Sequence, residues 1–132
     1  MNDLIHINLL FFRGVDLFNK KEYYDAHEEW EEMWSEYFLS DRLFIQGLIQ
    51  VTVSFYHLST NSIIGSKNLM SRAINKLTKL GPSNGNWLPV IRGIDAYGFI
   101  SKIQICYDSL LNINNIDEFD WDLVPTINKI KL

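Results

Sequence analysis

The placement of proline is the sequence feature that most constrains this fold. All three prolines, Pro82, Pro89 and Pro125, lie beyond residue 80, so the first eighty residues lack the residue that most reliably breaks a helix. Apolar residues there recur at helical spacing, and Gly81 before Pro82 is a stop signal. We therefore expect four helices, a loop over 81–94, a fifth helix and a tail over 112–132. The expected helices cover residues 3–18, 22–37, 41–58 (beginning at Ser40 or Asp41), 62–80 and 95–111.

Length and composition indicate one folded all-α domain, 1–132. The chain has 132 residues and a mass of 15.5 kDa, which suits a single core, and 47% hydrophobic residues exclude intrinsic disorder. The stretch 41–58 is apolar almost all round, which predicts the central helix of a bundle of about five. The tail carries Phe119, Trp121, Leu123 and Ile127, enough apolar surface to pack back on the bundle.

The cysteine content and the N-terminal segment indicate a cytoplasmic protein. Cys106 is the single cysteine, so neither an internal disulfide nor a Cys-based zinc motif is expected. The apolar run near the start is interrupted by His6 and Asn8 and is too short for a membrane span. We expect no signal peptide and no membrane anchor.

Charge is segregated along the chain. The second expected helix carries an acidic stripe, and the fourth carries a basic stripe of Arg72, Lys76 and Lys79. The acidic stripe consists of Glu22, Asp25, Glu29, Glu32 and Glu36. Two solvated faces explain this pattern, and so does a homodimer in which the acidic face of one subunit meets the basic face of another. The net charge of −4 argues against a nucleic-acid partner for the basic stripe.

A few polar residues fall on the expected apolar faces. On a helical wheel, His27 lies in the middle of an aromatic face formed by Tyr23, Trp30, Trp34 and Tyr37, with Glu31 about 40° away and Glu28 at the boundary. Gln46, Gln50 and His57 share one stripe on the third helix. Because a short turn joins these two helices, we expect the two polar sets to face each other across their seam. His6 is expected to have no role.

Three interpretations of this seam stay open. His27, Glu31 and His57 would ligate a divalent metal, with open positions for water. Alternatively, His27, Glu28 and Glu31 would act in general acid–base catalysis, for example in hydrolysis of a small molecule bound by Gln46, Gln50 and His57. The third interpretation is a purely structural hydrogen-bond network in a non-enzymatic interaction or oligomerisation module.

Two blocks of sequence resemble domain-of-unknown-function family 309. Residues 23–34 fit the pattern Y-x-x-A-H-E-x-x-E-x-x-W, and residues 42–50 fit R-x-F-x-Q-G-L-I-Q, within a similar stretch of about 11–80. The resemblance implies a small all-helical bundle and no established reaction. It carries over these motif residues: Ala26, His27, Glu28, Glu31, Trp34, Arg42, Gln46, Gly47, Gln50 and His57. It thereby adds Trp34 and Arg42 to the candidate binding residues. Lys21, where glycine is common, and Ser66, where alanine is common, depart from the pattern.

Overall fold

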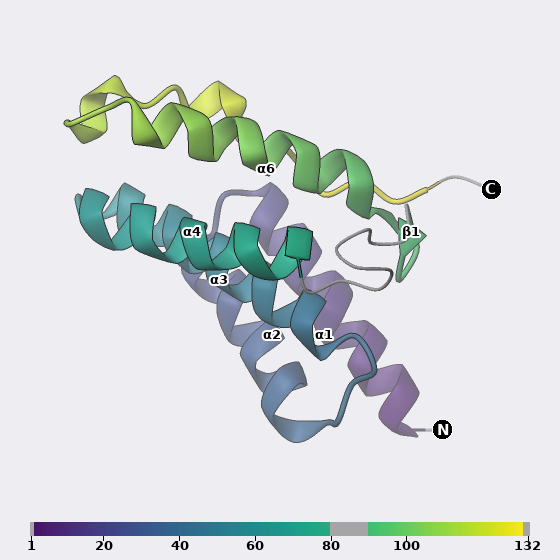
Figure 1. Ribbon diagram of the computed structural model, residues 1–132. Coiled ribbons are helices and arrows are strands. Elements are labelled where there is room, and N and C mark those ends of the chain that lie inside the picture. The colour runs from purple at the N-terminus through teal and green to yellow at the C-terminus, as the bar shows by residue number, and fades with distance from the viewer. Residues whose placement is uncertain (1, 80–89, 131–132) are drawn as a thin grey trace.

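Five helices in chain order make up most of the computed structural model, which describes residues 2–79 and 90–130 (Figure 1). The helices are α1 (Asn2–Asn19), α2 (Tyr23–Glu36), α3 (Arg42–Ser59), α4 (Ile63–Lys79) and α6 (Ala96–Leu111). Each begins and ends within one or two residues of the expected range, except that Leu80, the expected end of the fourth helix, lies outside the described residues. The all-α fold class is therefore confirmed.

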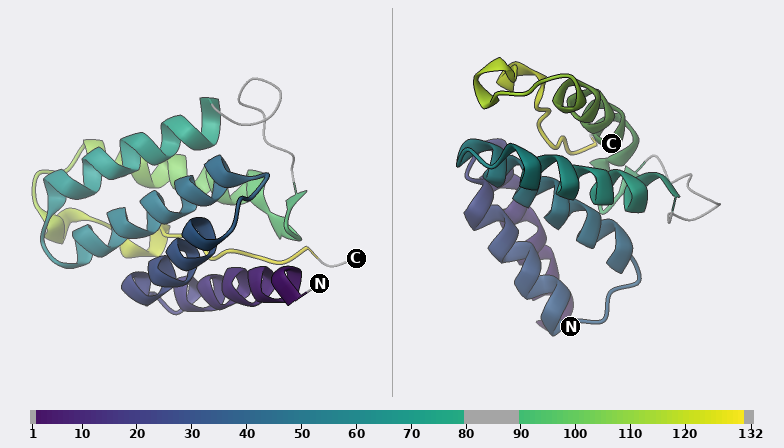
Figure 2. Two further views of the ribbon diagram at one scale, coloured as in Figure 1. Left: turned by 90° about the horizontal axis from the view of Figure 1, so that it is seen from below. Right: turned by 60° about the vertical axis from the view of Figure 1, so that its left-hand side comes forward.

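The helices form successive antiparallel pairs. α1 packs on α2, α3 packs on α4, and α2 also packs on α3, so that α3 lies between α2 and α4 as expected. The pair α1 and α2 crosses beneath α3 and α4, while α6 lies on the opposite side and packs on α4 (Figure 2). Ten of the eighteen residues of α3 are buried, which explains its nearly uniform hydrophobicity.

Two helix ends adopt the same left-handed cap. At the end of α1, Lys21 has φ of 66°, and the Glu22 amide donates to the Leu17 carbonyl at 2.9 Å. At the end of α3, Asn61 has φ of 68°, and the Ser62 amide donates to the His57 carbonyl at 2.7 Å. Both arrangements are Schellman motifs, in which glycine is the usual residue. Glycine at position 21 would therefore fit this backbone conformation better than lysine does.

The contact between α3 and α4 is close at Gly47. A Cβ added there would lie 2.7 Å from Cδ2 and 2.8 Å from Cγ of Leu77, so a larger residue would force the buried Leu77 side chain to move. Nearby, Ser54 Oγ donates to the Ser66 carbonyl at 2.7 Å and lies 3.0 Å from Ser66 Oγ. Both serines are fully buried, so Ser66 is matched by a polar partner on α3.

A small hairpin corrects the expectation of a plain loop over 81–94. Strands β1 (Val90–Ile91) and β2 (Ile94–Asp95) pair antiparallel, with Val90 opposite Asp95 and Ile91 opposite Ile94. The two turn residues, Arg92 and Gly93, both have positive φ, which gives the turn the twist of a two-residue hairpin. Residues 80–89 lie outside the described part of the chain.

The tail returns across the bundle after two short 3-10 helices, η1 (Ile116–Glu118) and η2 (Trp121–Leu123). Phe119 and Ile127 are buried, and the ring of Trp121 stacks on Tyr23. The Ile127 backbone exchanges two hydrogen bonds with the Asn19 side chain, at 2.7 and 3.0 Å. The tail also pairs with the hairpin, because the Asp95 amide donates to the Asn128 carbonyl at 2.9 Å. It therefore joins the end of α1 to β2.

Candidate functional site

α2 presents a different face to the core than the aromatic residues suggested. Its buried residues are Tyr23, Ala26, Trp30 and Met33. Ala26 and Met33 move the centre of this face away from Trp34, so that His27 lies at its margin and is half-buried. Glu28 and Glu31 are exposed. The expectation that Glu31 points toward the interior is therefore wrong.

His27 belongs to a row of rings on the outer surface of α2 and α3. Its Nδ1 lies 2.6 Å from the Tyr24 carbonyl; since a carbonyl only accepts, Nδ1 carries a proton. Its ring meets Tyr24 edge-on at 5.0 Å, and Tyr24 meets Tyr56 of α3 at 5.3 Å. The ring centroids of Tyr56 and His57 are 6.2 Å apart. We call Tyr24, His27, Tyr56 and His57 the ring row.

The polar residues of α3 face α4 instead of α2. Gln50 Oε1 accepts a hydrogen bond from Lys76 Nζ at 3.1 Å. The His57 ring lies next to Gly65 of α4, 3.5 Å from where a Cβ would stand. The half-buried Gln46 makes no side-chain hydrogen bond within the described residues. The expected meeting of Gln46, Gln50 and His57 with Glu31 across the α2–α3 seam is wrong, because α3 has two partner helices and this stripe faces the other one.

Trp34 and Arg42 form a contact that the motif residues alone did not indicate. The Arg42 guanidinium carbon lies 4.0 Å from the Trp34 ring centroid and 5.4 Å from that of Phe38, whose side chain is 92% exposed. This cation–π contact fastens the start of α3 to the end of α2. Arg42 and Trp34 therefore have a structural role whatever else they bind.

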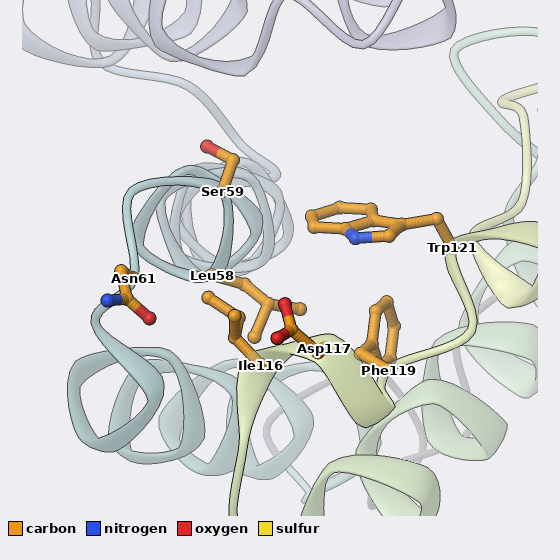
Figure 3. Close-up of a pocket in the computed structure, with 7 residues that line it drawn as sticks. All are labelled: Leu58, Ser59, Asn61, Ile116, Asp117, Phe119 and Trp121. Carbon is orange, nitrogen blue, oxygen red and sulfur yellow. The ribbon is translucent and has the colours of Figure 1, made fainter.

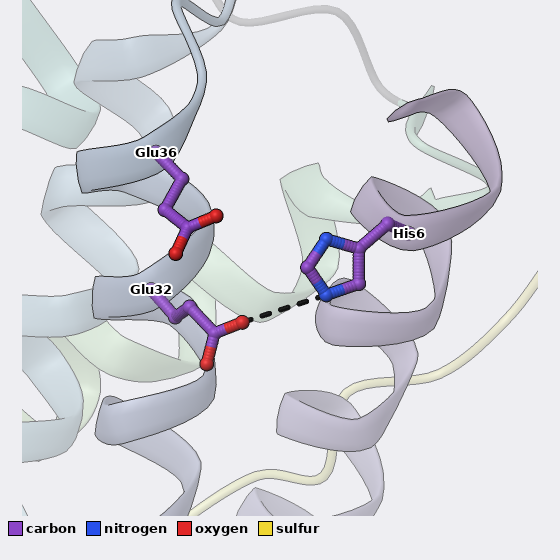
Figure 4. A group of neighbouring side chains, drawn as sticks. All are labelled: His6, Glu32 and Glu36. Carbon is purple, nitrogen blue, oxygen red and sulfur yellow. Dashed lines mark ion pairs between the residues drawn. The ribbon is translucent and has the colours of Figure 1, made fainter. Parts of the chain in front are cut away.

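A group that could hold a metal ion occurs elsewhere than predicted. Within residues 2–79 and 90–130, the only three His, Cys, Asp or Glu side chains whose ligand atoms all lie within 4.8 Å of one another are those of His6, Glu32 and Glu36 (Figure 4). His27, Glu31 and His57 are not brought together in this way, which corrects the predicted metal set. Residue spacing does not reveal the group, because His6 lies on α1 and the two glutamates lie on α2.

Tyr37 lies beside this group. His6 Nδ1 is 2.5 Å from Tyr37 Oη, and His6 Nε2 is 3.4 Å from Glu32 Oε2. The pKa of Tyr37 is raised above its ordinary value, first by loss of hydration and then by the negative charges of Asp3, Glu36 and Glu32. Tyr37 therefore stays a neutral phenol at physiological pH.

Two of the pockets lie near the start of α2 and the end of α3. One of about 500 Å³ lies between the end of α3 and the tail and is lined by Leu58, Ser59, Asn61, Ile116, Asp117, Phe119 and Trp121 (Figure 3). Another, of about 350 Å³, is lined by Lys21, Glu22, Tyr23, Tyr24, Asp25, Tyr56 and Ser59. Tyr24 and Tyr56 connect this second pocket to the ring row. None of the sequence-predicted site residues lines either pocket.

The fold and these surfaces define a small all-helical protein. No helix in the described part of the chain is both long enough and apolar enough to cross a membrane. The model of the family described as "Domain of unknown function (DUF309)" matches residues 11–69, which include all of α2 and α3. This match confirms the resemblance seen in the two sequence blocks. A search of curated proteins found no match.

Proposed function

We propose that this protein is a non-enzymatic interaction module whose α2–α3 surface binds a segment of another protein rich in lysine and arginine. The observation that carries the proposal is the uncompensated charge of α2. This helix contains six acidic residues and neither lysine nor arginine. Within the described residues, only Glu32 among these acids has an ion-pair partner, His6.

The acidic charge of α2 works against its own stability. Asp25 and Glu29, Glu28 and Glu32, and Glu32 and Glu36 are pairs of like charge one helical turn apart. Each such pair destabilises a helix by roughly 0.2–0.5 kcal/mol. A cationic partner would relieve this repulsion, so binding and stabilisation of α2 would be coupled.

Tyrosine rings lie beside the acids on the same surface. Tyr24, His27, Glu28 and Glu31 follow one another at helical spacing on the outer face of α2, and Tyr24 is 49% exposed. Tyr24 also contacts Tyr56 across the helix pair. Ring faces next to carboxylates suit the guanidinium of arginine, which binds through cation–π contacts as well as ion pairs. The combination favours a basic segment over a small neutral molecule.

Acid–base catalysis has weaker support on this surface. His27 uses Nδ1 on the carbonyl of its own helix, and no hydrogen bond or ion pair joins it to Glu28, Glu31 or His57 in the described structure. Catalysis needs a base whose partner orients it toward a substrate. The interaction module is therefore preferred over a hydrolase.

A second copy of the chain is a less suitable partner than another protein. Of the basic stripe on α4, Lys76 is half-buried and donates to Gln50, while Arg72 is exposed. The side chain of Lys79 lies outside the described residues. Among the described side chains of the basic stripe, Arg72 is thus the one free cation that a homodimer would have to offer.

The test is fluorescence anisotropy with a labelled hexa-arginine peptide at low salt. The double variant Glu28→Gln, Glu31→Gln should weaken binding roughly tenfold, since an exposed ion pair contributes up to about 1 kcal/mol. Tyr24→Ala should weaken it several-fold without any change in charge. The matched control is Asp108→Asn, Glu118→Gln, which removes two exposed acids on other elements and should change affinity less than twofold.

If the control pair weakened binding as much as Glu28→Gln, Glu31→Gln, only net charge would attract the peptide, and the proposal would be overturned. Unchanged peptide binding by Tyr24→Ala would overturn it as well. Light scattering of the protein alone tests the homodimer. A dimer that dissociates with salt and is lost in the Glu28→Gln, Glu31→Gln variant would assign this surface to a second copy instead.

A further inference from the structure

We propose that His6, Glu32 and Glu36 form a binding site for a divalent transition metal, with Zn²⁺ as the best fit, at the corner where α1 begins and α2 ends. The site lies on the side of α2 that meets α1, with Glu32 about 140° and Glu36 about 180° around the helix from His27. His6 also lies outside the residues matched by the DUF309 model.

The spacing of the ligand atoms fits a zinc ion. Bonds from zinc to histidine nitrogen and carboxylate oxygen are about 2.0–2.2 Å long, which places neighbouring ligands of a tetrahedral ion roughly 3.4 Å apart. His6 Nε2 and Glu32 Oε2 are 3.4 Å apart. All three candidate ligand atoms lie within 4.8 Å of one another, so small side-chain rotations would close the set around an ion.

The second nitrogen of His6 is held as in many metal sites. Histidine ligands usually donate their other ring N–H to an oxygen, which fixes the tautomer and the direction of the ring. His6 Nδ1 contacts Tyr37 Oη at 2.5 Å, and the two rings meet edge-on at 5.7 Å. The Tyr37 contact at Nδ1 leaves Nε2 facing Glu32 (Figure 4).

The surrounding charge favours a cation. Glu32 and Glu36 lie one turn apart in the last turns of α2, where the helix dipole is negative, and no lysine or arginine pairs with either in the described structure. Asp3 adds a third carboxylate near Tyr37. One imidazole and two carboxylates suit Zn²⁺, and water would complete the coordination.

The metal would join the exposed start of α1 to the end of α2. The side chains of His6 and Glu32 are 37% and 47% exposed, and the residues of the first two turns of α1 are exposed or half-buried. A metal ion shared between α1 and α2 would restrain both ends at once. Binding should therefore raise the melting temperature of the protein.

The test is calorimetric titration of protein without a histidine tag with zinc sulfate, followed by a melting scan with and without zinc. One Zn²⁺ should bind per chain and raise the melting temperature. His6→Asn or Glu32→Gln should weaken binding at least tenfold and abolish the thermal shift. Tyr37→Phe should weaken it about tenfold through loss of the contact to Nδ1. Co²⁺ should give the intense visible absorption of a tetrahedral site in wild type and lose it in His6→Asn.

The matched controls are His27→Asn and Glu31→Gln, which remove the same chemical groups at positions about 100° or more around α2 from Glu32 and Glu36 and should leave zinc affinity unchanged. Circular dichroism verifies that each variant keeps its helices. Absence of zinc binding by the wild type, unchanged affinity in His6→Asn, or loss of binding in His27→Asn would each overturn the proposal.

Discussion

Replacing Lys21 by glycine should make the protein more stable. Lys21 ends α1 with φ of 66°, in the left-handed region that a residue with a Cβ enters only at a cost. The side chain of Lys21 is exposed and makes no hydrogen bond or ion pair in the described structure. The substitution therefore removes backbone strain and little else.

The gain is the difference between two opposing effects. Left-handed backbone costs a residue with a side chain roughly 1–2 kcal/mol, whereas glycine adds about 0.4–1 kcal/mol of entropy to the unfolded chain. We expect a net stabilisation of about 0.5–1 kcal/mol. With an unfolding entropy of about 2.1 cal/mol/K per residue, this raises the melting temperature of a chain of this length by roughly 2–4 °C.

Thermal and urea unfolding of three variants provide the assay. Lys21→Gly should be stabilised, and Lys21→Ala, which keeps the Cβ, should stay within about 0.5 kcal/mol of wild type. Asn61→Gly should gain less than Lys21→Gly, because asparagine tolerates its φ of 68° better than lysine does. If Lys21→Ala were stabilised as much as Lys21→Gly, the effect would come from the lysine side chain, and the reasoning from backbone strain would be refuted.

Three further predictions concern packing, titration and an ion pair. Gly47→Ala should lower the free energy of unfolding, measured in urea, by about 1–2 kcal/mol, because crowding against Leu77 outweighs the better helix propensity of alanine. An unchanged unfolding midpoint would contradict the close contact. Burial, and then the charge of Cys106, raise the pKa of Tyr23 to about 12. The stability that the neutral phenol contributes is therefore complete below pH 10 and is lost as the pH rises from 10 to 12. Tyr23→Phe should reduce this alkaline loss and should leave the stability at pH 7 unchanged or higher, since Tyr23 Oη has no hydrogen-bond partner in the described structure. Asp41→Asn should lower the free energy of unfolding by about 1–3 kcal/mol, because it disrupts the two hydrogen bonds of 2.6 and 2.7 Å that the Arg92 guanidinium donates to the Asp41 carboxylate. A double-mutant cycle with Arg92→Met should show coupling between the two residues. Additive effects would mean that the ion pair contributes nothing to stability.

The helices were predictable because their signals are local. Apolar spacing, the absence of proline before residue 80 and the stop at Gly81 and Pro82 depend only on neighbours in sequence. The hairpin was missed because its strands have two residues each, too short to show alternation. Its turn, Arg92 and Gly93, has one residue that commonly adopts positive φ and one that does not.

The candidate site was less predictable because it depends on how the helices are rotated and paired. The wheel of α2 identified an aromatic face correctly in outline, but Ala26 and Met33 turn the buried face away from Glu31. Gln50 was assigned to the wrong seam, since a central helix has two neighbours and a single wheel does not choose between them. His27 and Tyr24 were found close together because they lie one turn apart in sequence.

The group of His6, Glu32 and Glu36 could not be predicted from spacing. The residues come from two helices whose register is set by core packing, including the buried bond from Trp30 Nε1 to the Phe11 carbonyl at 3.1 Å. Wheel analysis treats each helix separately, so His6 appeared as an ordinary surface residue. Only the pairing of α1 with α2 gives it chemical neighbours.

The return of the tail to α1 has a consequence for the order of folding events. The hydrogen bonds between Asn19 and Ile127 join residues 108 positions apart, so they close a loop whose length-dependent entropic cost is about 4 kcal/mol. The helical hairpins close far shorter loops and can form first. The amides of Ile127 and Ile130 should thus report a detachment of the tail that leaves the α3 and α4 pair intact, a partial opening visible to hydrogen exchange before global unfolding.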